Sequence, residues 1–178
     1  MRLFIAATLA PEQQQKLEQA QQLLLQNSEK ISLTKAENLH LTLHFLGETE
    51  AADAQQLLAA LREFEFPSRE KLRSRVAGYG YFKRRDGDLI YADLAVTPEV
   101  FQLQENLGQL LCELGFHIDK RRWKAHVTLA RRTRLAVSRR QLEAKLPLQK
   151  QSYAFSRLAL FKSEFTQQGM LYTSLFHY

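Results

Sequence analysis

Two histidines carry the strongest chemical signal in this chain, because each is followed two positions later by a threonine. The tetrapeptides His40-Leu41-Thr42-Leu43 and His126-Val127-Thr128-Leu129 stand 86 residues apart. Both lie in alternating apolar and polar sequence, which is the period of a half-buried strand. Since residues i and i+2 of a strand point to the same face, each histidine shares a face with its threonine. If the two strands face one cleft, two imidazoles and two hydroxyls can perform acid–base chemistry on a phosphate without a metal ion.

A purely structural interpretation of these residues stays open at this point. His40 and His126 could be partly buried strand histidines that hydrogen-bond to their neighbours. A further histidine, His44, is expected on the same face as His40, about 13 Å along the strand. That distance is too great for joint metal chelation, so we expect His44 to line the outer cleft. His117 and His177 have no local context and are expected to be structural.

The composition bounds the class of protein. The chain has 178 residues, of which 45% are hydrophobic and 25% charged, as is usual for a soluble globular protein. Its single cysteine, Cys112, excludes an intramolecular disulfide and cannot by itself build a thiolate metal site. No apolar run approaches the ~20 residues of a membrane helix, and the N-terminus lacks a full signal-peptide pattern. We expect a cytoplasmic monomer with no cofactor, no metal and no membrane contact.

Basic residues are in excess and are clustered. Lysine and arginine outnumber aspartate and glutamate by 25 to 19, for a formal net charge of +6 and a pI near 9.5. The clusters are 69–75, Lys83-Arg84-Arg85, Lys120-Arg121-Arg122-Trp123-Lys124 and Arg131-Arg132-Thr133-Arg134. A basic run is often only a solvated face, but the last two flank the second His-x-Thr. Their position favours a field that attracts phosphate.

The order of expected elements is α+β. Strands are predicted at 2–9, 31–35, 38–46, 73–82, 88–96, 116–118, 153–165 and 170–176 and through His126; helices are predicted at 11–27, 51–64, 98–115 and 138–146. Hairpins are expected at Asp86-Gly87 and around Gln167-Gln168-Gly169. Each half of the chain holds one His-x-Thr strand followed by a helix, and no low-complexity linker separates the halves. We therefore expect one domain of two lobes, residues 1–178.

Several neighbouring residues have two interpretations each. Arg131 can add a charged contact to a phosphate, but it lies five residues past His126, nominally on the opposite face, so a surface role is equally open. Four aromatic residues near the basic clusters could stack on a base, although core packing is their more frequent fate: Tyr79, Tyr81, Phe82 and Trp123. Cys112 follows the apolar pattern of a helix and is expected in the core.

The two motifs resemble those of a known family. Asn38-Leu39-His40-Leu41-Thr42-Leu43-His44-Phe45-Leu46-Gly47 and Ala125-His126-Val127-Thr128-Leu129-Ala130-Arg131 resemble the signature motifs of the 2H phosphoesterases. Within that superfamily the chain is most similar to the bacterial RNA 2′,3′-cyclic phosphodiesterases, also known as the LigT-like or 2′-5′ RNA ligase family. Its opening Arg2-Leu3-Phe4-Ile5-Ala6 and its ending, from Leu158 to Tyr172, are similar to that family too. The resemblance spans essentially the whole chain.

The resemblance implies an α+β, bilobal fold with two pseudo-symmetric lobes, each with an antiparallel sheet and helices, around a central cleft. It also implies hydrolysis of a terminal 2′,3′-cyclic phosphate on RNA to a 2′-phosphate, without a metal, and possible reversible 2′-5′ ligation. His40 is then the proton donor to the departing 3′ oxygen and His126 the proton acceptor that activates water. Thr42, Thr128 and Arg131 are expected to bind the phosphate.

Other classes of function compete with this one. A pure RNA-binding module needs the basic and aromatic residues but not the histidines. A zinc protein needs three or four converging ligands, and the sequence offers no close His, Cys or Asp spacing to supply them. Among enzymes, a phosphodiesterase of 2′-5′ oligonucleotides or of small cyclic nucleotides is the alternative.

Overall fold

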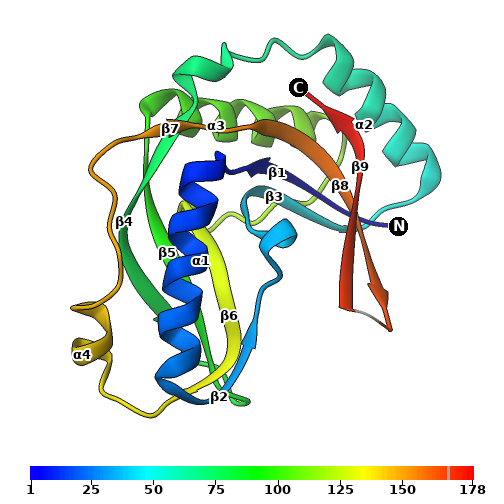
Figure 1. Ribbon diagram of the computed structural model, residues 1–178. Coiled ribbons are helices and arrows are strands. Elements are labelled where there is room, and N and C mark those ends of the chain that lie inside the picture. Colours follow the sequence, from blue (N-terminus) through cyan, green and yellow to red (C-terminus); the bar gives the residue numbers. More distant parts are fainter. Residues whose placement is uncertain (168) are drawn as a thin grey trace.

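The computed structural model of the protein describes residues 1–167 and 169–178. Its strands form two antiparallel sheets, one in each of two lobes (Figure 1). The first sheet has the order β3-β1-β8-β9, with bounds β1 Arg2–Thr8, β3 His40–Glu48, β8 Arg157–Thr166 and β9 Gly169–His177. The second has the order β2-β6-β5-β4-β7, with bounds β2 Ser28–Leu33, β4 Arg73–Phe82, β5 Asp88–Val96, β6 His126–Leu135 and β7 Tyr153–Ala154. The two predicted lobes and their antiparallel sheets are thus confirmed.

Four α-helices and two short 3₁₀ turns connect these strands. The bounds are α1 Pro11–Gln26, α2 Ala51–Glu63, α3 Pro98–Glu113, α4 Arg139–Glu143, η1 Ala36–Asn38 and η2 Arg69–Lys71. Both α1 and α3 begin with a proline, whose fixed φ suits the first helical turn. At the other end of α3, Gly115 has a φ of +84° and reverses the chain. Ser138 caps α4 through a capping box with Gln141.

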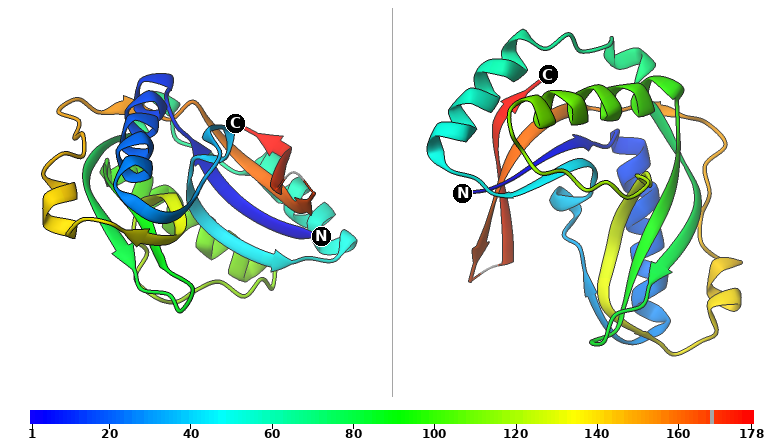
Figure 2. Two further views of the ribbon diagram at one scale, coloured as in Figure 1. Left: turned by 60° about the horizontal axis from the view of Figure 1, so that its bottom comes forward. Right: turned by 180° about the vertical axis from the view of Figure 1, so that it is seen from behind.

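The first helix of each half packs against the sheet of the other half. Helix α1 follows β1 of the first sheet, yet it contacts β2 and β6 of the second; α3 follows β5 of the second sheet and contacts β3 of the first (Figures 1 and 2). The Gln21 side-chain amide donates to the Leu129 carbonyl at 2.9 Å. On the other lobe, His44 Nε2 donates to the Gln104 carbonyl at 2.7 Å. This exchange ties the lobes together on both sides of the strands that carry the candidate site.

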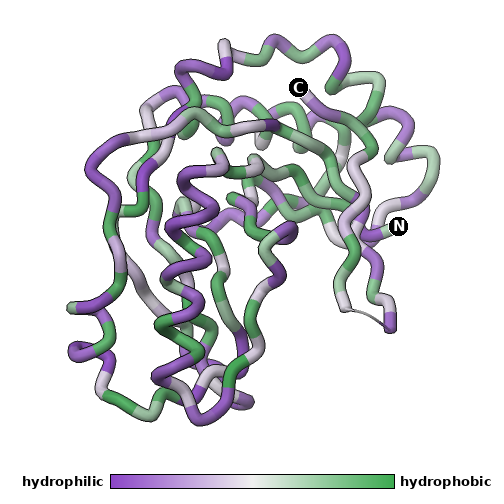
Figure 3. The backbone as a smooth tube through the Cα atoms, viewed as in Figure 1, coloured by the Kyte–Doolittle hydropathy of each residue, from purple (hydrophilic) through white to green (hydrophobic). Residues whose placement is uncertain are grey.

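Most buried hydrophobic residues of both lobes belong to one cluster. In Figure 3 the central strands are mostly coloured hydrophobic, whereas α1 alternates between polar and apolar residues. In α3 the buried stripe is Val100, Leu103, Leu107 and Leu111, the spacing of one helix face. Cys112 is exposed, which contradicts its predicted place in the core. One residue further along a helix turns the side chain by about 100°, off the buried stripe.

Most of the predicted elements are confirmed, and two predictions are wrong. No strand forms at 116–118, where the chain runs as an irregular connection from α3 to β6. The predicted strand at 153–165 is divided into β7 and β8, which belong to different sheets. The final hairpin is present, since Thr166 pairs with Gly169; Gln168 lies outside the described residues. Among the described residues no helix is long and apolar enough to span a membrane.

Burial of His44 predicts a pH dependence of stability. Its side chain is 6% exposed, and a Cβ at Gly108 would come within 3.0 Å of its ring. Burial lowers the His44 pKa below its ordinary value of 6.5, partly opposed by the hydrogen bond to the Gln104 carbonyl. The unfolded chain therefore binds a proton at this histidine more readily than the folded protein does. The contribution of neutral His44 to the free energy of unfolding is complete above pH 6.5 and is lost as the pH falls through the folded-state pKa. In urea denaturation at a series of pH values, His44→Gln is expected to weaken the dependence of the free energy of unfolding on pH. An equal slope of that free energy against pH in the wild type and in His44→Gln would contradict this expectation.

Candidate active site

The two His-x-Thr strands contact one another across the boundary between the lobes. His40 is the first residue of β3 and His126 the first residue of β6, and these two strands are in contact. His40 lies opposite Thr8 of β1, and His126 lies opposite Asp93 of β5. The two predicted His-x-Thr strands therefore meet, with one histidine contributed by each sheet.

Both imidazoles are held in the same way. His40 Nδ1 lies 2.7 Å from the Asn38 carbonyl oxygen, and His126 Nδ1 lies 2.8 Å from the Lys124 carbonyl oxygen. A carbonyl only accepts hydrogen bonds, so Nδ1 carries the proton in each ring. The Nε2 of a neutral ring is then the unprotonated nitrogen. In His40 this nitrogen accepts a hydrogen bond from the Thr42 hydroxyl at 3.1 Å.

A β-bulge follows each threonine at the same place in the motif. Along β1 and β3, Ala6 pairs with Thr42 but Ile5 pairs with His44, so Leu43 is an extra residue. Along β5 and β6, Tyr91 pairs with Thr128 but Ile90 pairs with Ala130, which makes Leu129 the extra residue. From the histidine onward, both strands show the same order of partly buried, buried, partly buried, buried, buried and exposed residues. An extra residue reverses which face the following side chains occupy.

These bulges correct two expectations from simple alternation. His44 does not share the face of His40 or line the outer cleft; it turns to the opposite face and is buried against α3. Arg131 moves the other way, onto the face of His126 and Thr128, where it is exposed. The position in β3 that corresponds to Arg131 is Phe45, which is also exposed.

The electrostatic environment of His40 shows which charges face it. Burial lowers the pKa of His40 below its ordinary value of 6.5, and the hydrogen bond to the Asn38 carbonyl opposes that shift. The positive charges of Arg131 and His126 lower it further. At neutral pH the unliganded protein therefore holds His40 mainly in its neutral form, with a cation from the second lobe close by.

Removal of the Arg131 charge is expected to raise the His40 pKa, because a nearby cation disfavours the imidazolium. NMR titration of the His40 ring protons in Arg131→Ala at low ionic strength measures the shift before salt screens it. Arg134→Ala, an exposed position on the same strand, is the matched control and should leave the His40 pKa as in the wild type. Equal pKa values in all three proteins would show that Arg131 does not act on the cleft.

Aromatic rings form the wall of the cleft beside His40. Its ring packs against Phe4 at 5.0 Å and meets the edge of Tyr172 at 5.4 Å between centroids. Phe4 in turn stacks on Phe161 at 5.3 Å. A cavity of about 560 Å³ opens next to His40. The residues that line it include Lys35, Arg157, Phe161 and Tyr172. This wall combines flat apolar surface with two cations.

The wall beside His126 is built differently. The His126 ring meets Tyr91 at 5.4 Å and Phe82 at 5.9 Å. Lys124 Nζ donates to the Tyr91 hydroxyl at 2.8 Å and lies 3.8 Å from Asp93. The Tyr91 hydrogen bond, more than the charge of Asp93, raises the Lys124 pKa, so this side chain stays a cation at neutral pH.

The four aromatic residues singled out in the sequence have different roles. Trp123 bridges the lobes, since its Nε1 donates to the Thr42 carbonyl at 3.0 Å. Tyr79 donates its hydroxyl to the Pro147 carbonyl at 2.6 Å, and the Arg139 guanidinium covers the Tyr81 ring at 3.2 Å. Phe82, 38% exposed, is the one of the four whose ring contacts a candidate catalytic histidine.

Sequence reasoning missed three cleft residues: Tyr91, Lys124 and Tyr172. The predicted hairpin around Asp86-Gly87 contained a signal for Tyr91, because its register sets Tyr91 opposite Gly80 and next to Thr128. The predicted structural histidines His117 and His177 are both exposed. Within 1–167 and 169–178, no group of three or more His, Cys, Asp and Glu side chains is placed to hold a metal ion.

The chain is similar to proteins of one family. A family model described as LigT like Phosphoesterase matches residues 8–91. A Thermotoga maritima protein named RNA 2′,3′-cyclic phosphodiesterase is 26% identical over 99% of this chain and 94% of its own length. An Aeropyrum pernix protein with the same name is 28% identical over 79% of this chain and 81% of its own length.

Solved structures agree in fold over the whole chain. A Thermus thermophilus crystal structure superposes with a TM-score of 0.74 at 27% identity, over 100% of this chain and 97% of that one. E. coli LigT, crystallised with 3′-AMP, has a TM-score of 0.72 at 24% identity, over 99% of this chain and 96% of that one. The likeness to the E. coli protein supports the bilobal α+β fold expected from the sequence.

Proposed function

Because this chain belongs to the LigT-like phosphoesterase family, we propose that it is an RNA 2′,3′-cyclic phosphodiesterase, which opens a terminal cyclic phosphate to a 2′-phosphate. The observation that carries the proposal is the matched pair of imidazoles. Each is contributed by a different lobe, and each has Nδ1 bound to the carbonyl two residues earlier. The names of the Thermotoga maritima and Aeropyrum pernix relatives point to the same reaction.

Hydrolysis of a cyclic phosphodiester needs two proton transfers on opposite sides of phosphorus. A water attacks in line with the departing oxygen; the oxygen–phosphorus bond forms as the bond from phosphorus to O3′ breaks. The water proton passes to Nε2 of His126, and Nε2 of His40 delivers a proton to O3′. Two imidazoles suit this exchange because either protonation state is accessible near neutral pH. The product keeps its phosphate on O2′.

The remaining motif residues stabilise the phosphate. The hydroxyls of Thr42 and Thr128 donate hydrogen bonds to the non-bridging oxygens, where negative charge is held. Arg131, on the same face as Thr128, adds a charged contact.

The role of His40 as acid depends on the substrate. Burial and the Arg131 charge lower the His40 pKa in the unliganded protein, which favours the neutral ring. A bound phosphodiester anion has the opposite effect, since a negative charge in contact favours the imidazolium. His40 therefore gains its proton together with the substrate, and Arg131 then faces the phosphate as well as the ring.

The product from an oligoribonucleotide with a 2′,3′-cyclic phosphate end tests the proposal. We expect a 2′-phosphate end, identified by ³¹P NMR or nuclease digestion, and the same rate with and without EDTA. A 3′-phosphate product would reverse the assignment of the leaving oxygen. Binding of the RNA without turnover would favour an RNA-binding module.

The same assay separates the other enzymatic alternatives. Faster turnover of 2′,3′-cyclic AMP, or of a 2′-5′-linked oligonucleotide, than of the RNA end would favour those substrates. The monomeric state and the cytoplasmic location stay predictions, which light scattering and cell fractionation test.

A further inference from the structure

Two consecutive residues, Trp123 and Lys124, contact both halves of the site. Trp123 Nε1 donates to the Thr42 carbonyl at 3.0 Å, and the Thr42 hydroxyl bonds to His40 Nε2. The carbonyl of the next residue, Lys124, accepts the Nδ1 proton of His126 at 2.8 Å. A single dipeptide therefore connects the hydrogen bonds that orient the two imidazoles, although the imidazoles belong to different sheets.

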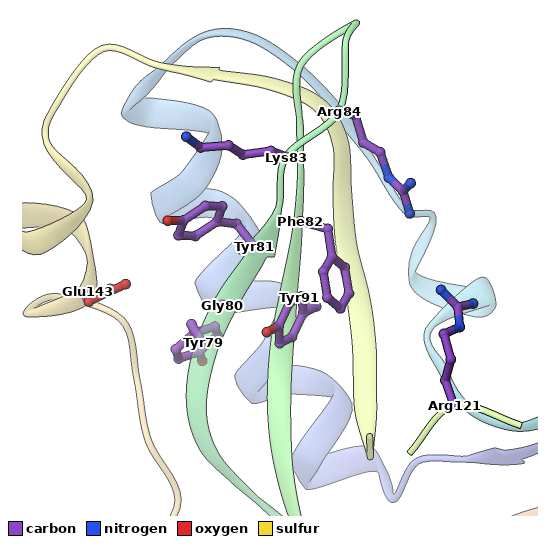
Figure 4. A pocket seen from close by; sticks show the side chains of 9 residues that line it. All are labelled: Tyr79, Gly80, Tyr81, Phe82, Lys83, Arg84, Tyr91, Arg121 and Glu143. Atoms are coloured by element: carbon purple, nitrogen blue, oxygen red, sulfur yellow. The ribbon is translucent and has the colours of Figure 1, made fainter. Parts of the chain in front are cut away.

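The Lys124 side chain anchors this dipeptide to the second sheet. Its Nζ donates to the Tyr91 hydroxyl at 2.8 Å and lies 4.7 Å from the centre of the Tyr91 ring. The Tyr91 ring crosses Gly80, where any Cβ would overlap the phenol. Figure 4 shows Tyr91 beside Phe82, on the side of β4 and β5 that Arg121 faces, and these three residues line a cavity of about 640 Å³. The segment that carries Lys124 is thus attached to β5.

The Trp123 side chain anchors the same dipeptide to the first lobe. Strand β3 is the outermost strand of the first sheet, so its outer edge pairs with no strand within 1–167 and 169–178. The half-buried indole meets Phe101 of α3 edge-on at 5.5 Å and donates its N–H to the Thr42 carbonyl. Thr42 directly precedes Leu43, the extra residue of the bulge. A bulge disrupts the ladder locally, so Trp123 supplies a bond to β3 where strand pairing is weakest.

The separation of the two histidines depends on contacts between the lobes, because His40 and His126 begin strands of different sheets. In-line attack places the nucleophile and the departing oxygen on opposite sides of phosphorus, so both Nε2 atoms must reach the reacting groups at once. A misplacement of about 1 Å can cost about 100-fold in rate. The Trp123 bond joins the lobes on a motif residue, two positions from His40. That bond is therefore placed to set the separation.

We propose that Trp123 is a positioning residue for the reaction, whose bond to Thr42 holds the His40 half of the site at the distance from the His126 half that in-line transfer needs. The inference rests on the proposed function. In it Trp123 contacts neither the phosphate nor a proton-transfer nitrogen, and it acts through Thr42. Loss of the bond lowers kcat, because the imidazoles no longer meet the phosphate together. KM changes little, because the cavity beside His40 and its cations are unchanged.

Replacement of one atom group tests this role. Trp123 is the single tryptophan of the chain, so 3-benzothienylalanine supplied in place of tryptophan changes this position alone and exchanges the indole N–H for sulfur. On an oligoribonucleotide with a 2′,3′-cyclic phosphate end, we expect kcat to fall at least about tenfold and KM to stay within about threefold of wild type. Trp123→Phe, which also lacks the N–H, should lower kcat at least as far. Phe101→Leu keeps the N–H and removes only the ring contact, so it should retain kcat within about threefold.

The His40 ring protons give a readout that does not depend on turnover. Burial, and the charges of Arg131 and His126 on the second sheet, lower the His40 pKa. Loss of the Trp123 bond lets the ring open to water and those charges move away. NMR titration should therefore show a higher His40 pKa in the benzothienylalanine protein than in wild type. A role of Trp123 in stability alone would lower the midpoint of urea unfolding and leave the His40 pKa unchanged.

Three results would overturn the inference. The first is wild-type kcat in the benzothienylalanine protein, and the second is an unchanged His40 pKa in that protein. The third is an equal loss of kcat in Phe101→Leu and Trp123→Phe, which would assign the effect to ring packing rather than to the N–H bond. Each of these leaves the proposed function intact, since the wild type still hydrolyses the RNA end. Absence of hydrolysis in the wild type would refute the proposed function itself.

Discussion

Alanine at either His40 or His126 is expected to lower kcat/KM for a cyclic-phosphate RNA end by at least about 100-fold, the usual contribution of a positioned general acid or base. The two losses should be of similar size, because one ring must release a proton while the other accepts one. Initial rates on a labelled oligonucleotide, with folding checked by circular dichroism, measure the effect. The fixed Nδ1 of both rings leaves Nε2 as the reacting nitrogen.

The double variant sharpens this expectation. If both imidazoles act in one step, His40→Ala combined with His126→Ala should be little slower than either single variant, since groups that act as a unit are not additive. His117→Ala is the matched control, because His117 is exposed, and it should keep the wild-type rate. Activity above half of the wild-type value in either cleft variant would rule out the two-imidazole mechanism.

The sequence predicted the two His-x-Thr strands because the evidence for each strand is local. Alternation assigns His40 and Thr42 to one strand face without any knowledge of the rest of the chain, and the same holds for His126 and Thr128. The repeat of this pattern in each half then predicted two similar lobes. The structure confirms both lobes, with the two strands in contact.

What the sequence could not predict depends on backbone register. The bulges at Leu43 and Leu129 occur at ordinary leucines that continue the apolar pattern. Only pairing with the neighbouring strand reveals the extra residue, and after it every face assignment reverses. That reversal explains why His44 is buried behind the cleft and why Arg131 joins it. Simple strand alternation, counted from His126, assigned Arg131 to the opposite face because it takes no account of the bulge at Leu129.

Long-range contacts supply the remaining parts of the site. Trp123 reaches the Thr42 carbonyl from a segment 81 residues later, and no local pattern predicts such a bond. The exchange of α1 and α3 between the lobes is likewise invisible to periodicity, which says that a helix has an apolar face but not which sheet covers it. The predicted strand at 116–118 failed here, since those residues belong to the connection that brings Trp123 to β3.

Valine at Thr42 or Thr128 is expected to lower kcat about 10- to 100-fold, somewhat less than the full loss of a donor in a closed oxyanion site. Valine keeps the branched shape and removes only the hydroxyl, so the strand and its bulge should be unchanged. If the hydroxyls hold charge that grows in the transition state, kcat falls more than KM rises. Thr42→Val also removes the hydrogen-bond partner of His40 Nε2, so its effect should be the larger of the two.

Serine provides the discriminating comparison. Thr42→Ser and Thr128→Ser keep the hydroxyl and should retain activity within about threefold, whereas a role of the threonine methyl in packing would make serine as harmful as valine. Thr173→Val, on the exposed edge strand β9, controls for loss of a hydroxyl elsewhere. Wild-type kcat in both valine variants would show that other donors, such as the cations Arg131 and Lys124, hold the phosphate oxygens.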